Sequence, residues 1–398
     1  MKRTLEGILV SVAAIVVTCV SLEALARVVR GARGPRPQET LERFEYDPLL
    51  GWRKHAGLRM QVRQPEYTVE LEINSHGLRD PERGYEAPPG TFRILALGDS
   101  FVEAYCVRAE DSVTQALEGE LRRSSVPAEV VNGGTGGYGT DQEFLFYESE
   151  GLRYGPKVVL LFFYYNDVLY NGQDRALGRA KPLLVAEQDG SLRPRDYPLP
   201  RLGPEAVDDE PVRASNPFGS LVLGWLQDRL RASDRRLYNR FTWLWPPIPL
   251  HKDVPLEMRV YERQPVHELE FSWTLTRTIL KALARDAQGR GIPFLAVYVP
   301  SRMEVDDRAW ARTKDLYGVS DQAWDRRHVV EILAEIGRES GFPVLDMTPA
   351  LRAAGAAYYP KDEHWTSVGH RTAAREVAHE LEKRGWVPQP AAENQPPP

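Results

Sequence analysis

Five runs of apolar residues recur along the chain, and each run is nearly continuous rather than alternating. They cover residues 92–97, 129–132, 157–165, 293–299 and 343–347. A strand that is buried on both faces needs apolar residues at successive positions, which is typical of parallel sheets covered by helices. We therefore predict five strands of a parallel sheet at these positions.

Between these runs, apolar residues recur at the spacing of an amphipathic helix. One stripe follows Ser112, with Gln115 in capping-box position, and another ends at Gly289 and Gly291, which stop a helix. The three stripes are Val113, Ala116, Leu117 and Leu121; Phe271, Leu275, Ile279 and Leu283; and Ala374, Val377, Ala378 and Leu381. Strands that alternate with helices predict an α/β fold, a doubly wound parallel sheet flanked by helices, with ligands at the carboxyl ends of its strands.

Two further segments differ from this pattern. Residues 43–91 form a β-rich segment, because residues 67–73 alternate between apolar and polar and residues 74–77 form a turn sequence. Residues 168–266 lack a sheet pattern and are rich in proline, with one amphipathic helix around residues 219–231, so we interpret them as a large Pro-rich insertion or cap. The remaining parts are a linker, a main domain that contains this insertion, and a disordered tail, at residues 31–42, 92–386 and 387–398.

Residues 1–30 have the pattern of an export or anchoring signal. Lys2 and Arg3 precede an uncharged stretch at residues 7–22, and Ala24-Leu25-Ala26 resembles a signal-peptidase site. Three interpretations stay open: an uncleaved transmembrane anchor, a signal cleaved near Ala26 so that the protein is secreted, and a buried core helix. Although arginines also follow the stretch, against the positive-inside bias, we expect the catalytic domain outside the cytoplasm, periplasmic or at the cell surface.

Composition restricts the class of function. The 398 residues include 51 Lys and Arg against 56 Asp and Glu, which gives a net charge of −5. A nucleic-acid binder needs a basic surface to release counterions from phosphates, so we expect no nucleic-acid partner. Two cysteines, Cys19 and Cys106, cannot form a disulfide framework, and no Cys/His cluster has zinc spacing, so we expect no structural metal.

The first predicted strand ends in Gly98-Asp99-Ser100-Phe101. A serine at a strand-to-helix junction lies at the mouth of a parallel sheet, where its hydroxyl is exposed and backbone N–H groups are close. Gly98 suits a tight turn at this junction. Ser100 is therefore a candidate nucleophile, and the alternative is a helix cap.

A serine nucleophile needs a base, and Asp362-Glu363-His364-Trp365 supplies one directly before the last helix. A carboxylate two residues from a histidine can accept the Nδ1–H of the imidazole, which leaves Nε2 to take the serine proton. His370 is expected to be structural. A zinc site of Asp362, His364 and His370 is the alternative, but no second cluster completes it.

Stabilisation of an oxyanion is the third requirement. The sequence Asn132-Gly133-Gly134-Thr135-Gly136-Gly137 follows the second strand, and its glycines leave backbone N–H groups open to a ligand. Asn166 follows the third strand and offers an amide donor at the same edge of the sheet, although it could be a turn residue. The glycine run lacks a Walker lysine and does not fit a dinucleotide-binding motif.

These four segments, in this order, resemble those of the SGNH hydrolases, also called the GDSL esterase and lipase superfamily. The resemblance covers residues 92–167 and 293–384 and implies a flavodoxin-like three-layer fold. It implies that Ser100 is the nucleophile, His364 the base and Asp362 its orienting group. It further implies that the oxyanion donors are Ser100, Gly134 and Asn166. Many members have glycine where this chain has Tyr164, which affects the acyl pocket. The sequence NSHGLRD at residues 74–80 is similar to that of membrane-anchored members.

The expected activity is hydrolysis of an ester through an acyl-serine intermediate, without a cofactor. Export suggests O-acyl or O-acetyl groups of a cell-envelope carbohydrate as substrate, and Trp225, Trp243 and Trp245 could stack on sugars, although a packing role is the alternative. Two other functions stay open. One is O-acyl transfer to a polysaccharide, and the other is non-catalytic glycan binding or assembly on the same fold.

Overall fold

The computed structural model describes residues 17–18, 20–28, 43–187, 191–201, 221–233, 235–241 and 249–388. They form two compact units. One contains Met1–Glu39, Ala206–Asp253 and Leu316–Gly318, and the other contains Thr40–Glu205, Val254–Asp315 and Val319–Pro398. The second unit holds the sheet and all the candidate site residues.

A five-stranded parallel sheet forms the centre of the second unit, with strand order β13-β12-β7-β5-β6. Each of the five predicted strands is present, which confirms the predicted fold class. Their bounds are β5 Phe92–Gly98, β6 Ala128–Asn132, β7 Val158–Tyr164, β12 Phe294–Val299 and β13 Val344–Asp346. Strands β5, β7 and β12 are buried along almost their whole length, as the continuous apolar runs require.

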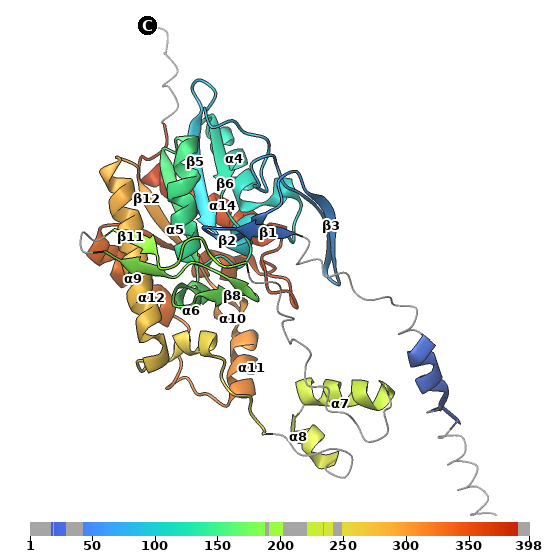
Figure 1. The fold of residues 1–398 in the computed structure, drawn as a ribbon. Helices are drawn as coiled ribbons and strands as arrows, with labels where there is room; N and C mark the ends of the chain where they lie inside the picture. Colours follow the sequence, from blue (N-terminus) through green and yellow to red (C-terminus); the bar gives the residue numbers. More distant parts are fainter. Residues whose placement is uncertain are drawn as a thin grey trace, which may run out of the picture. The chain divides into compact units, whose positions relative to one another are not determined.

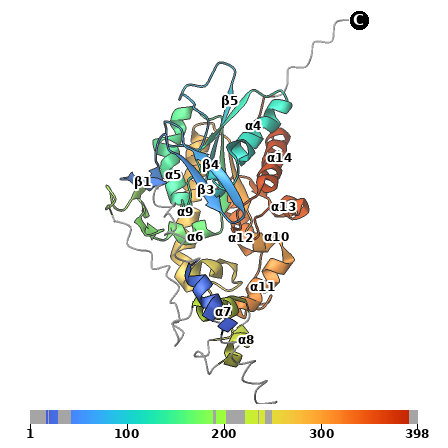
Figure 2. The same cartoon turned by 90° about the vertical axis from the view of Figure 1, so that its right-hand side faces the viewer.

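Helices cover both faces of this sheet, so the domain has three layers (Figures 1 and 2). Helices α4 and α14 lie together on one face, and α5, α9 and α12 lie on the other. Their bounds are α4 Val113–Arg123, α5 Thr140–Ser149, α9 His267–Gly289, α12 His328–Ser340 and α14 Ser367–Lys383. Further helices lie in the connections: α3 Ser100–Glu103, α6 Asn166–Asn171, α10 Arg302–Val305, α11 Asp307–Tyr317 and α13 Thr348–Ala354.

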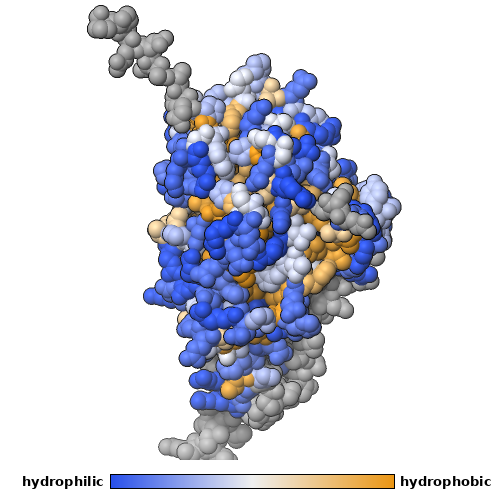
Figure 3. Space-filling view, turned by 90° about the vertical axis from the view of Figure 1, so that its left-hand side faces the viewer, coloured by the Kyte–Doolittle hydropathy of each residue, from blue (hydrophilic) through white to orange (hydrophobic). Residues whose placement is uncertain are grey.

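The helix boundaries follow from local sequence. Ser112 caps α4 by accepting the Gln115 N–H at 3.3 Å, as predicted, and α9 ends at Gly289 before Gly291 at φ +71°. Helix α9 buries Leu275, Ile279 and Leu283 of its predicted apolar stripe, but Phe271 is 57% exposed, so the prediction was wrong at the first position of the stripe. The face that carries α9 is mostly hydrophilic (Figure 3).

The sheet order reverses at β5. The chain moves from β5 to β6 on one side and then passes back to β7 on the other. In a doubly wound sheet the crevice outside the carboxyl ends of the strands opens at this switch point. The loops after β5 and β7, which carry Ser100 and Asn166, therefore flank the same crevice.

Residues 43–91 contain two antiparallel strand pairs, β1 Phe44–Asp47 with β2 Gly51–Lys54 and β3 Arg59–Gln64 with β4 Tyr67–Glu72. We call residues 43–91 the leading β segment. Strand β4 alternates strictly between buried and exposed residues, as residues 67–73 predicted. Its buried residues form a small apolar cluster with Ala104, Cys106 and Val107, which follow α3.

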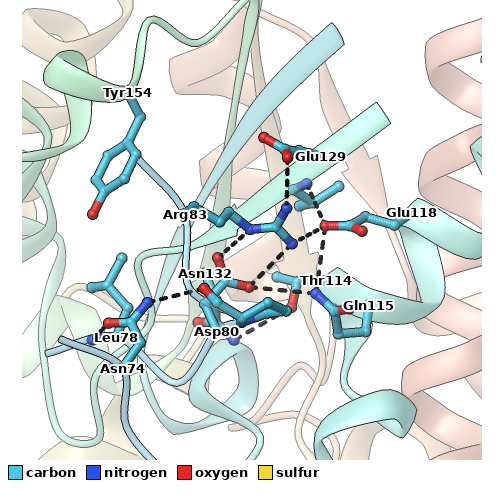
Figure 4. A network of polar contacts seen from close by, with 12 residues as sticks. Asn74, Leu78, Asp80, Arg83, Thr114, Gln115, Glu118, Glu129, Asn132 and Tyr154 are labelled. Carbon is cyan, nitrogen blue, oxygen red and sulfur yellow. Dashed lines mark hydrogen bonds and ion pairs between the residues drawn. The ribbon is translucent and has the colours of Figure 1, made fainter. Parts of the chain in front are cut away.

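A buried arginine ties the leading β segment to the main domain (Figure 4). Arg83 donates to Asp80 at 2.7 Å and to Glu118 of α4, and it also pairs with Glu129 of β6 at 3.4 Å. Burial raises the pKa of Asp80 to about 7, against the opposing effect of the Arg83 charge. The segment is thus anchored to α4, the helix of the first crossover, and to β6, the strand that follows it.

The predicted insertion contains more β structure than expected. Two short antiparallel pairs form in it, β8 Arg175–Ala176 with β9 Arg179–Ala180 and β10 Leu184–Ala186 with β11 Leu192–Pro194. The sequence did not reveal these pairs, because strands of two or three residues show no periodicity. These pairs belong to the unit that contains the sheet.

The helix expected around residues 219–231 is present as α7 Leu221–Ser233, followed by α8 Arg235–Tyr238. Both belong to the first unit, with helical residues 20–28, and the Val222 N–H donates to Glu23 at 3.1 Å. Trp225 is 66% exposed, whereas Trp243 and Trp245 lie outside the described residues. In the described part of the chain no helix has both the length and the apolar character needed to span a bilayer. The linker at 31–42 and almost all of the expected tail lie outside the described residues.

Candidate active site

Ser100 is the first residue of α3, directly after β5. Asp99 caps this short helix by accepting the Phe101 N–H at 2.9 Å. A side chain on Gly98 would approach Val102 to 2.4 Å, so glycine permits the sharp turn from strand to helix. Burial raises the pKa of Asp99 to about 6, and the Phe101 N–H and the His364 charge oppose that rise. The first predicted site residue is therefore held at the mouth of the sheet.

His364 lies within hydrogen-bond distance of both Ser100 and Asp362, the two residues predicted to act with it. Ser100 Oγ is 2.7 Å from His364 Nε2, and His364 Nδ1 is 2.6 Å from Asp362 Oδ1. We place the imidazole proton on Nδ1, from which it is donated to Asp362. Nε2 is then unprotonated and can accept the serine proton. The hydroxyl, imidazole and carboxylate thus have the order that an activated serine requires.

The loop between α13 and α14 folds back on itself to present Asp362 and His364. The Tyr359 N–H donates to the His364 carbonyl at 2.9 Å, and the Glu363 N–H donates to the Tyr359 carbonyl at 3.1 Å. Glu363 has φ +66°, which is uncommon for a residue with a side chain. This backbone conformation allows the side chains of Asp362 and His364 to contact each other.

The leading β segment supports Asp362, which the sequence did not indicate. Tyr67 donates its hydroxyl hydrogen to Asp362 Oδ2 at 2.8 Å, so the second carboxylate oxygen is also held. The Glu66 carboxylate accepts the backbone N–H groups of Asp362 at 2.8 Å and Lys361 at 3.0 Å. These contacts span almost 300 positions, so only the folded chain reveals them.

Neighbouring groups favour the ionised form of the Asp362 carboxyl. Burial would raise the pKa of this carboxyl, but the His364 contact and the Tyr67 hydrogen bond hold it below its usual value. The carboxylate therefore stays ionised at neutral pH and can stabilise an imidazolium at His364. Tyr105 lies close as well, with its hydroxyl 3.2 Å from His364 Nδ1.

A cavity of about 290 Å³ opens beside these residues. Asn166 lies in its wall, and the amide oxygen of Asn166 is buried without a partner among the described residues. Tyr164 also lines this cavity and narrows it with its aromatic ring. It stands at the position where the resemblance led us to expect glycine. The lining residues include Ser100, Phe101, Tyr105, Gly136, Gly137, Tyr164, Asn166, Tyr170, Leu177 and His364.

The structure corrects the expected glycine donor. The Gly134 N–H donates to the Asn132 side chain at 3.0 Å, and Gly134 packs against α3 so closely that a side chain there would lie 2.4 Å from the Glu103 nitrogen. Gly136 and Gly137 line the cavity instead. The Gly136 N–H is bonded to Glu103, whereas the Gly137 N–H makes no hydrogen bond within the part of the chain that the structure describes. Gly137 is therefore the better candidate for the oxyanion donor.

His370 lies buried in α14, with its ring edge against Trp365 at 5.4 Å between ring centroids. Burial lowers its pKa to about 3, so the imidazole is neutral. Among the described residues no group of three or more His, Cys, Asp or Glu side chains is arranged to hold a metal ion.

A serine, histidine and aspartate joined at the switch point of a parallel sheet define the arrangement of a serine-dependent acyl-transfer enzyme. Residues 261–396 match the family described as SGNH hydrolase-like domain, acetyltransferase AlgX. This segment contains Asp362 and His364 but not Ser100, so the match supports the resemblance to SGNH hydrolases for that part of the chain. No curated protein matches the sequence.

Several solved structures share some likeness with the chain. A lipase/acylhydrolase from Enterococcus faecalis is 12% identical with a TM-score of 0.36, over 76% of this chain and 100% of its own. The acetyl xylan esterase AlAXEase is 12% identical with a TM-score of 0.38, over 73% and 100%. A two-domain esterase (CEX) active on acetylated mannans is 11% identical with a TM-score of 0.37, over 76% and 53%. These similarities are too weak to assign an activity or a substrate.

Proposed function

We propose that this protein cleaves an acyl ester through a covalent acyl-serine intermediate. The observation that carries the proposal is the continuous chain of hydrogen bonds from Ser100 through His364 to Asp362, at 2.7 and 2.6 Å, beside a small cavity. We propose Ser100 as nucleophile, His364 as general base and Asp362 as its orienting carboxylate.

In this reaction Ser100 Oγ attacks the ester carbonyl while His364 Nε2 takes the serine proton. The tetrahedral oxyanion receives hydrogen bonds from the N–H groups of Ser100 and Gly137 and from the Asn166 amide. The C–O bond then breaks, and His364 returns the proton to the leaving alcohol. Water, deprotonated by His364, then attacks the acyl carbon. The bond to Ser100 Oγ breaks as His364 returns the proton to Oγ, and the acid is released.

The proposed substrate is an O-acylated carbohydrate with a short acyl group. The cavity of about 290 Å³ supports a small acyl chain. Transfer of the acyl group to a sugar hydroxyl is the second candidate, and the description of the family that matches residues 261–396 as acetyltransferase favours it. Both reactions share the acyl-serine and differ only in the acceptor.

We also propose that residues 1–30 export or anchor the chain so that this site works outside the cytoplasm. The proposal rests on the uncharged stretch 7–22, which follows Lys2 and Arg3. Cell fractionation with a tagged full-length chain tests it, and recovery in the cytosolic fraction alone would contradict it.

The decisive experiment compares wild type with Ser100→Ala on 4-nitrophenyl acetate and on acetylated sugars, with and without a glycan acceptor. We expect Ser100→Ala to lose at least about 1000-fold in turnover. Ser124→Ala, a change at the end of α4 outside the cavity, should keep wild-type turnover. Activity in Ser100→Ala equal to wild type would refute the nucleophile. Acylated glycan rather than free acid as the main product would establish transfer, and no labelling of Ser100 by a fluorophosphonate would favour a non-catalytic protein.

A further inference from the structure

The short hairpin of β8 and β9 brings a side chain of the insertion to the cavity beside Ser100. The two strands pair over two residues each, which leaves a two-residue turn of Leu177 and Gly178. Leu177 of this turn lines the cavity together with Ser100 and His364. The insertion lies outside the segments that resemble SGNH hydrolases, yet it contributes part of the wall of the candidate active site.

A buried lysine fixes the base of this hairpin. Lys181 directly follows β9, is completely buried and forms an ion pair with Asp141 of α5. Its Nζ also donates to the backbone carbonyls of Tyr170 at 2.8 Å and Gln173 at 3.2 Å. Because the turn is only two residues long, a fixed base also fixes the position of Leu177 beside the cavity.

The backbone of the turn is unfavourable for leucine. Leu177 has φ +51° and Gly178 has φ +69°. Two-residue hairpin turns with positive φ at both positions favour Asn-Gly, Asp-Gly or Gly-Gly, because a larger side chain is crowded by the backbone there. Leu177 is also 46% exposed, so it is not a core residue. Local stability does not explain a leucine at this position, and strained residues of this kind are concentrated at functional sites.

The Leu177 side chain packs against Gly137, the proposed oxyanion donor. A side chain on Gly137 would lie 2.3 Å from Leu177 Cδ1, so the leucine occupies space that is open only because residue 137 is glycine. Gly137 lines the same cavity. Leu177 therefore lies on the side of the cavity where the carbonyl oxygen of an ester would be held.

The two sides of the cavity suit different parts of an ester. The leaving alcohol receives its proton from His364, so it has to lie on the histidine side of the carbonyl carbon. On that side the rings of Phe101 and Tyr105 flank the imidazole, at 4.9 and 5.1 Å between ring centroids. The acyl chain extends from the same carbon away from the leaving alcohol, which is the side of Gly137 and Leu177.

We propose that Leu177 limits the length of the acyl chain, by closing the acyl side of the cavity with an apolar side chain. The inference rests on the proposed acyl-serine function and specifies its substrate class, which is an ester of a short apolar acyl group such as acetyl. Binding of that group covers the exposed part of the leucine, and this burial of apolar surface favours a chain that fits in front of it.

Two substitutions at this position separate the volume of the side chain from the conformation of the turn. Leu177→Gly removes the side chain, whereas Leu177→Asn keeps one of nearly the same shape. Both glycine and asparagine favour the positive φ of the turn, so the two variants differ mainly in volume. Circular dichroism melting curves verify that both variants fold.

The substrates are 4-nitrophenyl acetate, butanoate and hexanoate, since release of 4-nitrophenolate reports acylation of Ser100 whether water or a sugar accepts the acyl group. We expect Leu177→Gly to raise kcat/KM for hexanoate relative to acetate about 10-fold, because methylene groups that the leucine excludes can then enter. Leu177→Asn should keep the wild-type ratio. Val185→Ala, a change on β10 outside the cavity, is the control and should also keep it.

Three results would overturn the inference. The first is a wild-type ratio in Leu177→Gly, and the second is an equal increase in Leu177→Asn, because the turn rather than the side-chain volume would then set the preference. The third is a changed ratio between 1-naphthyl acetate and 4-nitrophenyl acetate in Leu177→Gly without any change among the three acyl chains, which would place Leu177 on the alcohol side.

Turnover by the wild type separates this inference from the proposed function. If the wild type cleaves 4-nitrophenyl acetate but one of these three results is found, the acyl-serine proposal stands and only the role of Leu177 is refuted. If the wild type releases no 4-nitrophenolate from any of the esters and a fluorophosphonate does not label Ser100, the proposed function fails, and the inference fails with it.

Discussion

The proposed role of Asn166 as an oxyanion donor depends on its side-chain amide alone. Its amide lies in the wall of the cavity beside Ser100, with the amide oxygen buried and unpartnered in the described chain. We expect Asn166→Ala to lower kcat about 100-fold or more, because one oxyanion donor contributes roughly 3 kcal/mol to the transition state. Thermal unfolding should be almost unchanged. A kcat within 3-fold of wild type would show that the amide does not face the oxyanion.

At the level of single residues, spacing along the chain singled out Ser100, Asp362 and His364 as candidates, and the folded chain brings them together. A serine after a buried strand and an Asp-x-His sequence before a helix both fall at the carboxyl edge of the sheet, although the sequence alone left a helix cap open for Ser100. The glycine donor could not be derived in that way. Six successive residues from Asn132 to Gly137 offer similar backbone N–H groups, and only tertiary contacts decide which of them is free. The same holds for Tyr67, which reaches the site from the leading β segment.

In the loop at residues 132–137, we expect Gly134 and Gly137 to have different roles. Gly134→Ala would place a methyl group 2.4 Å from the Glu103 backbone nitrogen, so it should lower the unfolding free energy by about 1–3 kcal/mol through overpacking. Gly137 has φ +77°, and its added side chain would meet the flexible end of Leu177. Gly137→Ala should therefore cost about 1–2 kcal/mol in stability and lower kcat about 100-fold by moving the N–H.

Urea unfolding and steady-state kinetics on the two variants distinguish these effects. The ratio of kcat loss to stability loss should be much larger for Gly137→Ala than for Gly134→Ala. The opposite order would return the oxyanion role to Gly134.

The hairpin of β3 and β4 is the second element that acts on the site from a distance. Glu66, at its tip, accepts the backbone N–H groups of Lys361 and Asp362. We expect Glu66→Ala to reduce kcat roughly 10-fold, because the loop would hold Asp362 less firmly, with little change in Tm since Glu66 is only partly buried at the tip of the hairpin. Glu70→Ala, at an exposed position of the same hairpin, is the matched control and should have no effect. An equal loss in both variants would mean that the hairpin acts through general stability.

Elements were predicted well where their sequence pattern was long. Strand β7 and helix α9 have continuous or periodic apolar residues over many positions, and both formed where the pattern indicated. The pairs β8–β9 and β10–β11 were missed because two or three residues cannot establish a period. Their formation depends on packing against the rest of the domain rather than on local sequence.

For the whole molecule, the buried cation Lys54 links stability to pH. Its carboxylate neighbour is Glu103, and the cations Arg43 and Arg79 also face it. Burial lowers the pKa of Lys54 from 10.5 to about 8, so between these two values the unfolded chain binds the proton and the folded chain does not. The free energy of unfolding should therefore rise with pH across this window, by up to about 3 kcal/mol from this group.

Lys54→Met removes that dependence. Urea unfolding of wild type and variant at pH 7.5, 9 and 10 gives the free energy of unfolding of each protein as a function of pH. The contributions of the other titrating groups cancel in the difference between the two proteins. We expect the wild type to gain stability relative to Lys54→Met as the pH increases. Parallel pH dependences would show that Lys54 is not desolvated in the folded protein.

The hydrogen bond between Tyr67 and Asp362 joins residues 295 positions apart, and that between Ser100 and His364 joins residues 264 positions apart. A nascent chain still on the ribosome can complete β5, β6, β7 and β12 long before residues 362 and 364 leave the exit tunnel. Premature termination between residues 300 and 361 therefore yields fragments with at least four of the five strands but without the proposed base. A chain with the proposed activity becomes competent only after translation is almost finished.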